Sequence, residues 1–154
     1  VKTCTIKREC GKWFVIFVVE TSAEPLSKTG QSVGMDAGIE SFMTLSDGSV
    51  IDNFKYFESA QKQLRKIQRK VARRKKGGNG RRKAVAIIQK AQAKIKNQRR
   101  DFHHKVSRSL VETYDVIAIE KLNILGLSKG ILSKQVHDAA WGNFFLTLKS
   151  KAAN

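Results

Sequence analysis

The pattern of apolar and polar residues changes its period along the chain, from two near the start to three and four in the middle. The first two runs, at 3–8 and 13–20, are rich in β-branched and aromatic residues and flank a short turn, so they predict a β-hairpin. A lone hairpin is only marginally stable, and residues 1–20 are therefore expected to pair with strands elsewhere in the chain or in a part of the parent protein outside it. Residues 21–31, which contain the only proline, predict a linker and a boundary near residue 31.

Three further strands, at about 33–38, 41–45 and 50–54, are predicted to form an antiparallel meander, with a tight turn at 46–49. Alternation in the first of them separates two faces, one carrying Val33, Met35 and Ala37 and the other carrying Gly34, Asp36 and Gly38. An ionised carboxylate in a core strand is costly unless a cation binds it, and small neighbours leave room for a divalent metal. Asp36 is therefore a candidate metal ligand, and the alternative is an edge or turn acid that faces water.

From residue 57 the apolar residues step by three and four, which predicts two amphipathic helices in a long hairpin over 57–113. The positions that carry this pattern are Phe57, Ala60, Leu64, Ile67 and Val71, followed by Ala84, Ile88, Ala91, Ile95, Phe102 and Val106. The second helix is expected to run from about Arg81 to Thr113, which is some 50 Å at roughly 1.5 Å per residue. The glycine-rich segment 77–80 supplies the reversal between the two helices.

The apolar run 114–120 predicts another strand, buried on both faces and ending in the acid Glu120. Because a helical crossover precedes it, this strand can lie parallel beside the strand that carries Asp36. The two acids would then lie close together and form a cation site. Residues 122–127 read as a loop or turn, and a last helix from about Ser133 to Leu148 is expected to pack its aromatic face on the sheet.

Charge is distributed very unevenly. The 154 residues carry 30 Lys and Arg against 13 Asp and Glu, a net charge of +17, and 59–100 holds 17 of the cations and no acid. A wholly basic helical hairpin repels itself and predicts a polyanionic partner, with nucleic acid as the first candidate and a merely solvated surface as the alternative. The expected nucleic-acid contacts are Lys62, Arg65, Lys66, Arg69, Lys70, Arg73, Arg74, Lys75, Lys76, Arg81, Arg82, Arg99 and Arg100. No element shows an obvious way of reading a base sequence.

Several other classes of protein are disfavoured. No apolar run approaches the roughly 18 to 20 residues of a membrane span, and the chain from Val1 reads as a strand rather than a signal peptide, so a soluble cytosolic protein is expected. Cys4 and Cys10 match neither a disulfide framework nor a four-ligand zinc set, and we interpret them as reduced and structurally minor. The chain also lacks a glycine-rich phosphate loop ending in Lys-Ser or Lys-Thr.

Histidines supply weaker catalytic candidates. His103 and His104 fall within the long predicted helix, and His137 precedes Asp138 near the start of the last one. Ser, Cys and His residues show no spacing that suggests a nucleophile triad, although residues distant in sequence can still meet in space.

The motifs, taken together and in order, resemble the RuvC-like domain of TnpB, the OrfB accessory protein of insertion sequences that is akin to type V CRISPR nucleases. They are Gly34–Ile39, the turn 45–48, the basic hairpin, and the segments 100–105, 117–123 and 138–144. The resemblance implies an α/β RNase H-like fold whose mixed sheet has a long basic helical hairpin inserted before its fourth strand. It further implies that Asp36 and Glu120 hold Mg²⁺ or Mn²⁺, and that the partners are DNA and a guide RNA in the cytoplasm of a bacterium or archaeon.

The same resemblance divides the chain into residues 1–20, the end of a preceding β-barrel (WED-like) domain, a linker at 21–31, and a RuvC-like domain at 32–154. The family continues with a four-cysteine zinc ribbon and a third catalytic Asp, whereas this sequence ends at Asn154, and Lys121 replaces a frequent acid. The piece is therefore expected to bind metal weakly and to cleave poorly or not at all. Two hypotheses stay open, a metal-dependent DNA endonuclease and a non-catalytic module that grips an RNA–DNA duplex, and a homodimer is not excluded.

Overall fold

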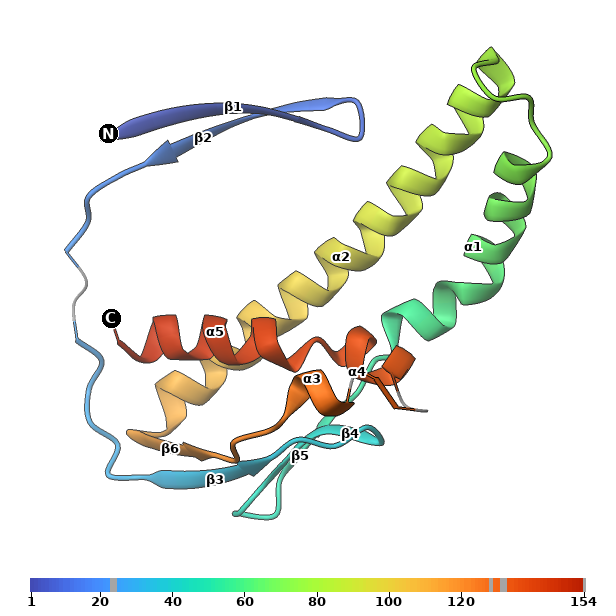
Figure 1. Cartoon of the computed structure of the whole chain (residues 1–154). Coiled ribbons are helices and arrows are strands. Elements are labelled where there is room, and N and C mark those ends of the chain that lie inside the picture. Colours follow the sequence, from blue (N-terminus) through green and yellow to red (C-terminus); the bar gives the residue numbers. More distant parts are fainter. Residues whose placement is uncertain (23–24, 128, 131–132, 154) are drawn as a thin grey trace.

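The computed structural model describes residues 1–22, 25–127, 129–130 and 133–153, and Figure 1 shows how they are arranged. A separate two-stranded sheet lies at the N-terminus and contacts the rest of the fold through an ion pair of Glu9 with Lys96, at 3.3 Å. A four-stranded mixed sheet with helices packed on it forms the rest of the fold. The predicted α/β class is therefore confirmed. The segment between the two sheets has no regular secondary structure in its described residues, as the predicted linker requires.

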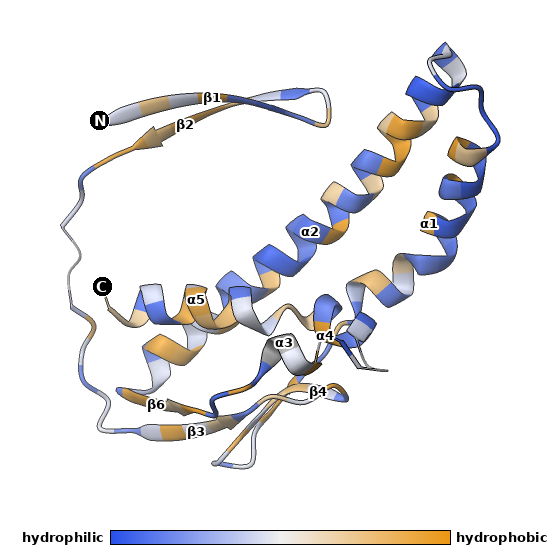
Figure 2. Cartoon of the chain, in the orientation of Figure 1, coloured by the Kyte–Doolittle hydropathy of each residue, from blue (hydrophilic) through white to orange (hydrophobic). Residues whose placement is uncertain are grey.

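The N-terminal hairpin is confirmed. Strands β1 (Thr3–Glu9) and β2 (Lys12–Val18) are antiparallel, and Glu9 is the register partner of Lys12. Cys10 and Gly11 make the turn in left-handed conformations, with φ of 51° and 82°, as a two-residue hairpin turn requires. Both faces of β2 are exposed, and its large apolar side chains give the orange strand in Figure 2. Within the described residues the hairpin pairs with no third strand.

The central sheet has the strand order β5-β4-β3-β6, formed by β3 (Ser32–Asp36), β4 (Ser41–Leu45), β5 (Val50–Asp52) and β6 (Val116–Ile119). The first three strands are antiparallel neighbours, so the predicted meander is confirmed, with β3 and β5 each two residues shorter at the end than expected. The last strand lies parallel to β3, as the helical crossover before it predicts.

The basic hairpin consists of α1 (Tyr56–Ala72) and α2 (Asn79–Thr113). Leu64 and Ile67 of the first helix and Ile95 of the second are buried, and Figure 2 shows apolar residues on the facing sides of both helices. The second helix begins two residues before the predicted start because the carbonyl of Gly78 already accepts the N–H groups of Arg81 and Arg82, at 3.0 and 3.1 Å. In the described residues, no helix has both the length and the apolar character needed to cross a membrane.

Helices cover one face of the sheet. The C-terminal half of α2 packs there with α4 (Ser133–Ala139) and α5 (Trp141–Ala152), above the strands in Figure 1. The buried cluster comprises Val33, Met35, Phe42, Met43, Leu45, Leu110, Val136, Ala139, Trp141, Phe144 and Leu148. The predicted contact of an aromatic helix face with the sheet is therefore confirmed.

Three details of the sequence prediction are wrong. The last strand is not buried on both faces, since Val116 is 61% exposed and helices cover only the other side. The last helix is two helices, because Ala140 adopts a left-handed φ of 50° that an α-helix cannot continue through. The segment expected to be a loop contains the short helix α3 (Ile124–Leu127), which the side chain of Asn123 begins by accepting the N–H of Gly126.

Candidate functional site

The acids Asp36 and Glu120 are on neighbouring strands. Asp36 is the last residue of β3, and Glu120 directly follows β6. Met35 and Ile119 are register partners in this parallel pair, so extending the register by one residue sets Asp36 opposite Glu120. Parallel partners point to the same face, and adjacent strands lie about 4.8 Å apart. Both acids are exposed. Val33 and Met35 face the helix-covered core, so alternation along β3 sets Asp36 on the other face of the sheet.

The surface beside the two acids carries small side chains. Gly34 and Ala118, register partners of each other, occupy the same face one alternation earlier. The hydroxyl of Ser46 accepts the N–H of Gly34 at 2.9 Å, and a Cβ added at Gly34 would lie 3.6 Å from the Cβ of Ser46. The prediction that Gly38 continues this face is wrong, because β3 ends at Asp36.

Neither carboxylate is neutralised by another residue that the structure describes. In the described part of the chain, the side chains of Asp36 and Glu120 have no hydrogen-bond or ion-pair partner. Over the same residues there is no group of three or more His, Cys, Asp and Glu that could hold a metal ion. Two unpartnered carboxylates on adjacent strands are oxygen donors of the kind that Mg²⁺ and Mn²⁺ prefer.

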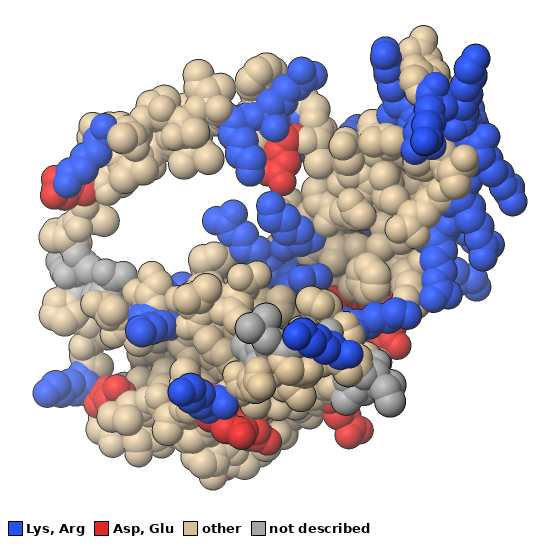
Figure 3. Space-filling view, in the orientation of Figure 1, with Lys and Arg blue, Asp and Glu red and all other residues tan. Residues whose placement is uncertain are grey.

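The second candidate region is the outer surface of the helical hairpin. Of the thirteen cations predicted to contact nucleic acid, eleven are exposed, and Figure 3 shows many Lys and Arg side chains along this part of the molecule. The exposed residues are Lys62, Arg65, Lys66, Arg69, Lys70, Arg73, Arg74, Lys75, Lys76, Arg82 and Arg100. No acid lies between Ser59 and Arg100 to neutralise them, so the surface is available to a polyanion.

The remaining two cations have intramolecular partners. Arg81 donates from Nη1 to the carbonyl of Val71 at 2.7 Å and so satisfies the C-terminal end of α1. Arg99 donates to the carbonyl of His137 at 3.1 Å and lies 3.4 Å from a carboxylate oxygen of Asp138. Both arginines are half-buried, and their guanidinium groups join parts of the fold together.

The three candidate histidines take part in contacts that hold elements of the fold together. His103 is 4% exposed, and its Nε2 donates to the carbonyl of Ala139 at 3.0 Å, because a carbonyl can only accept. Burial lowers the pKa of His103 below its usual value, so the neutral ring is favoured. The carbonyl of His104 accepts a hydrogen bond from the ammonium of Lys151, and that of His137 accepts one from Arg99.

Three acids that the sequence did not single out organise the region around the site. The hydroxyl of Ser49 and that of Tyr114, which lies 2.5 Å from Asp47, lower the pKa of Asp47 to about 2. The N–H groups of Thr29 and Gly30 lower the pKa of Asp115, which thereby anchors the end of the linker beside β6. Asp138 is buried and contacts α1 from a distant part of the chain. Of these contacts, the sequence indicated only those of Asp47 with Ser49, which lie within the predicted tight turn at 46–49.

The fold and the site define a mixed α/β protein that combines an exposed acid pair at the end of two parallel strands with a basic helical hairpin. A family model, OrfB_IS605, described as a probable transposase, matches residues 15–130. The chain belongs to this family, and the resemblance to TnpB (OrfB) is confirmed.

Curated relatives support the same assignment. The chain is 39% identical to a putative RNA-guided DNA endonuclease of Streptomyces pristinaespiralis, over 98% of this chain and 38% of that protein. It is 35% identical to the putative RNA-guided DNA endonuclease InsQ of Escherichia coli (strain K12), over 84% of this chain and 32% of that protein. It is 28% identical to the TnpB-like protein L79 of Acanthamoeba polyphaga mimivirus, over 86% of this chain and 27% of that protein. The chain thus spans about a third of the length of these relatives.

Proposed function

We propose that this chain is the RuvC-like part of a transposon-encoded, RNA-guided DNA endonuclease that depends on a divalent metal. The observation that carries the proposal is the parallel pairing of β3 with β6, whose last register partners, Met35 and Ile119, are each followed directly by one of the two acids. The sheet order β5-β4-β3-β6, in which β6 is parallel to β3, supports an RNase H-like fold. The names of the bacterial relatives support the reaction and both nucleic-acid partners.

The residues present fit a site for Mg²⁺ or Mn²⁺. Magnesium keeps several waters and uses one or two protein carboxylates together with substrate phosphates, which is what an exposed acid pair without protein partners offers. Asp36 and Glu120 would hold the cation from two neighbouring strands, and the small residues Gly34 and Ala118 would leave space for the phosphate of a nucleic-acid strand. The chemistry that such a cation would supply is the activation of water and the stabilisation of the departing oxygen in phosphodiester hydrolysis.

The hairpin supplies the binding energy for nucleic acid. The exposed cations of the hairpin, among them the eleven named above, fit a phosphate backbone and carry no information about base sequence, so selection of the target falls to pairing with a guide RNA. An RNA–DNA duplex suits such a surface, because A-form geometry is recognised through its backbone and shape. The function of the hairpin in this proposal is therefore to hold the duplex while the acid pair acts on DNA.

The proposal is tested by DNA cleavage with the full-length parent protein, its guide RNA and MgCl₂. Asp36→Ala and Glu120→Ala are each expected to abolish cleavage, since one carboxylate alone leaves the cation poorly held. Glu40→Ala and Asp52→Ala remove exposed acids near the same strands and serve as matched controls that are expected to cleave normally. Cleavage that survives in both Asp36→Ala and Glu120→Ala would refute the assignment of the site.

A second function, binding of an RNA–DNA duplex without cleavage, is favoured by one observation. Among the described residues the acid pair has no third acidic, His or Cys neighbour, whereas the family resemblance implies a third catalytic Asp. In this case the duplex binds equally well with and without MgCl₂, and the parent protein shows no cleavage. Comparing this chain with the parent protein separates the two functions, because the endonuclease proposal expects cleavage in the longer protein.

A further inference from the structure

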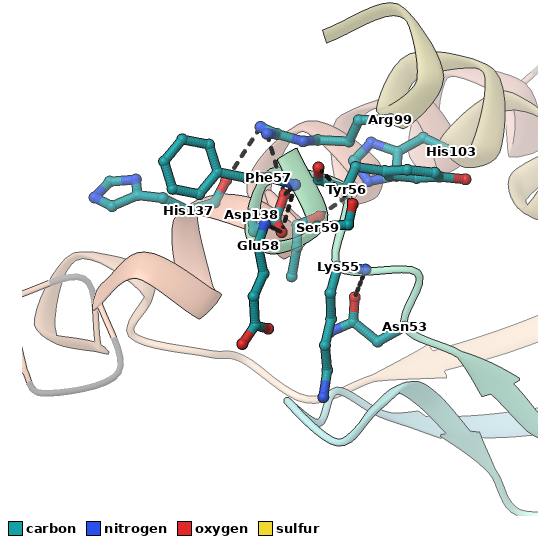
Figure 4. A network of polar contacts seen from close by, with 11 residues as sticks. Asn53, Lys55, Tyr56, Phe57, Glu58, Ser59, Arg99, His103, His137 and Asp138 are labelled. Atoms are coloured by element: carbon teal, nitrogen blue, oxygen red, sulfur yellow. Dashed lines mark hydrogen bonds and ion pairs between the residues drawn. The ribbon is translucent and has the colours of Figure 1, made fainter. Parts of the chain in front are cut away.

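The first helix of the basic hairpin is capped by a residue from the far end of the chain. The N–H of Phe57 lies 2.9 Å from both carboxylate oxygens of Asp138, and the N–H of Glu58 lies 3.3 Å from one of them (Figure 4). The residue in the usual capping position, Lys55, makes no side-chain capping bond. The N-terminus of α1 is therefore held by a tertiary contact and not by a neighbour in sequence.

The same carboxylate also meets the second helix of the hairpin. Arg99 of α2 lies 3.4 Å from Asp138 and donates to the carbonyl of His137 in the same turn of α4. The side chain of Asp138 is 7% exposed and that of Arg99 is 24% exposed, so both charges are largely removed from water. A buried carboxylate needs such compensation, and here it comes from a guanidinium and the positive end of a helix. One side chain thus joins α1, α2 and α4.

Unusual backbone conformations occur next to the contact of Asp138 with α1 and α2. Three non-glycine residues in the described chain have positive φ, and two of them, Lys55 and Ala140, lie close in sequence to the residues of this contact. Lys55 precedes α1 with φ 44°, and Ala140 precedes α5 with φ 50°, two residues after Asp138. Such conformations persist where the surroundings determine the backbone closely, and they concentrate at functional positions.

We propose that Asp138 is a positioning residue that sets α1 against the core, and with it the nine cations between Lys62 and Lys76, so that a bound duplex keeps one placement relative to Asp36 and Glu120. The second helix does not depend on Asp138 for its position, because its C-terminal half is packed on the core, where His103, Ser107 and Leu110 are buried. The first helix packs on α2 through Leu64 and Ile67, and Asp138 attaches its N-terminal end to α4. The proposal rests on the proposed role of the hairpin in binding nucleic acid.

The placement of α1 is measured directly by distances between two spin labels. Labels at Gln63→Cys on α1 and Val50→Cys on β5, both exposed sites, are introduced with Cys4→Ser and Cys10→Ser. Asp138→Asn keeps the shape and one acceptor oxygen but removes the charge, and is expected to broaden or shift the distance distribution. Asp101→Asn is the matched control, because that exposed acid pairs with Lys105 at the surface, and it is expected to leave the distribution unchanged. A distribution in Asp138→Asn identical to that of the unaltered protein would overturn the proposal.

The consequence for binding is measured with a fluorescent RNA–DNA duplex. Asp138→Asn is expected to weaken binding by about tenfold, since misplaced cations lose phosphate contacts. Arg99→Gln removes the positive partner of Asp138 and is expected to weaken binding similarly. Arg100→Gln removes one exposed cation and is expected to have a smaller effect. Mn²⁺ affinity of the acid pair stays unchanged in all three variants, which separates misplacement of α1 from general loss of folding. Unchanged duplex affinity in Asp138→Asn alongside an altered distance distribution would also overturn the proposal.

The two proposals fail in different ways. If the hairpin does not bind nucleic acid, the unaltered protein shows no duplex binding, while the spin-label distances still respond to Asp138→Asn. If Asp138 does not position α1, the unaltered protein binds the duplex and neither the distances nor the affinity change in the variant.

Discussion

Met35 of β3 and Ile119 of β6 are register partners, and each is followed directly by an acidic residue. The pairing is parallel, so the two acids leave their strands at the same end of the sheet and on the same face. A shift of one residue in this register would put one acid on the face that the helices cover. The relationship between these two apolar residues therefore decides whether Asp36 and Glu120 can share a cation.

The two acids are expected to destabilise the metal-free fold and to stabilise the fold when a metal is bound. Two like charges on adjacent strands are destabilising, so Asp36→Asn is expected to raise the free energy of unfolding of the metal-free chain by about 0.5 kcal/mol. MnCl₂ is expected to stabilise the unaltered chain and not the variant, because a ligand that binds only the folded state raises its stability. Urea denaturation with and without MnCl₂ measures both effects. Asp52→Asn on β5 is the control, and stabilisation by MnCl₂ that is equal in Asp36→Asn and the unaltered chain would contradict the prediction.

The hairpin predicts a salt dependence that its cations control. Replacing Lys66, Arg69 and Lys70 with Gln is expected to make the slope of log affinity against log salt shallower by about 0.9 for each lost contact with B-form DNA. Fluorescence anisotropy of a labelled duplex at several salt concentrations gives this slope. The control replaces Lys2, Lys7 and Lys12 of the N-terminal hairpin and changes the net charge equally. Equal loss of slope in the two triple variants would show that net charge, and not the helical surface, governs binding.

His103 predicts a loss of stability in mild acid. Burial keeps its pKa in the folded protein below the usual value near 6.5, so the unfolded chain binds more protons as the pH falls past that value. Its contribution to stability is therefore complete above the unfolded pKa and declines as the pH falls toward the folded one. Urea midpoints measured across this range are expected to fall less steeply with decreasing pH in His103→Gln. The exposed His104 is the matched control, and His104→Gln is expected to keep the pH dependence.

In the aromatic cluster between the sheet and its helices, we expect one core residue to have a large effect on stability. Phe144 is fully buried, and its ring meets those of Phe42 and His103 at centroid distances of 5.0 and 5.6 Å. Phe144→Ala is expected to lower the free energy of unfolding by about 3–5 kcal/mol, because a cavity replaces a filled volume. Leu146→Ala, two residues later on the same helix and 68% exposed, is expected to change it by less than about 0.5 kcal/mol. Denaturant titration of both variants makes the comparison.

Local patterns predicted most of the elements. Period-two runs marked the N-terminal hairpin and the meander, and steps of three and four marked α1 and α2. The parallel placement of β6 beside β3 followed from the helical crossover between them. These features could be predicted because each depends on residues close in sequence or on a general rule of chain connection.

Contacts between distant residues could not be predicted in the same way. The capping of α1 by Asp138 joins residues 81 positions apart, and nothing near Phe57 in the sequence indicates it. The same holds for Arg99. Its basic neighbours in the sequence predicted a contact with nucleic acid, whereas in the fold it forms an ion pair with Asp138. The exposure of Val116 likewise depends on which side of the sheet the helices cover.

The sequence by itself determined most of the helices and strands, the concentration of positive charge on one hairpin, and the position of Asp36 and Glu120 at strand ends, because periodicity and composition act locally. Tertiary structure alone decided that the acids face away from the helices, that Ala140 separates two helices, and that a carboxylate in α4 anchors α1. The physical reason is that register, burial and capping partners depend on which surfaces meet when the chain packs. That choice minimises the exposed apolar area and the unpaired polar groups of the whole fold, and no single segment encodes it.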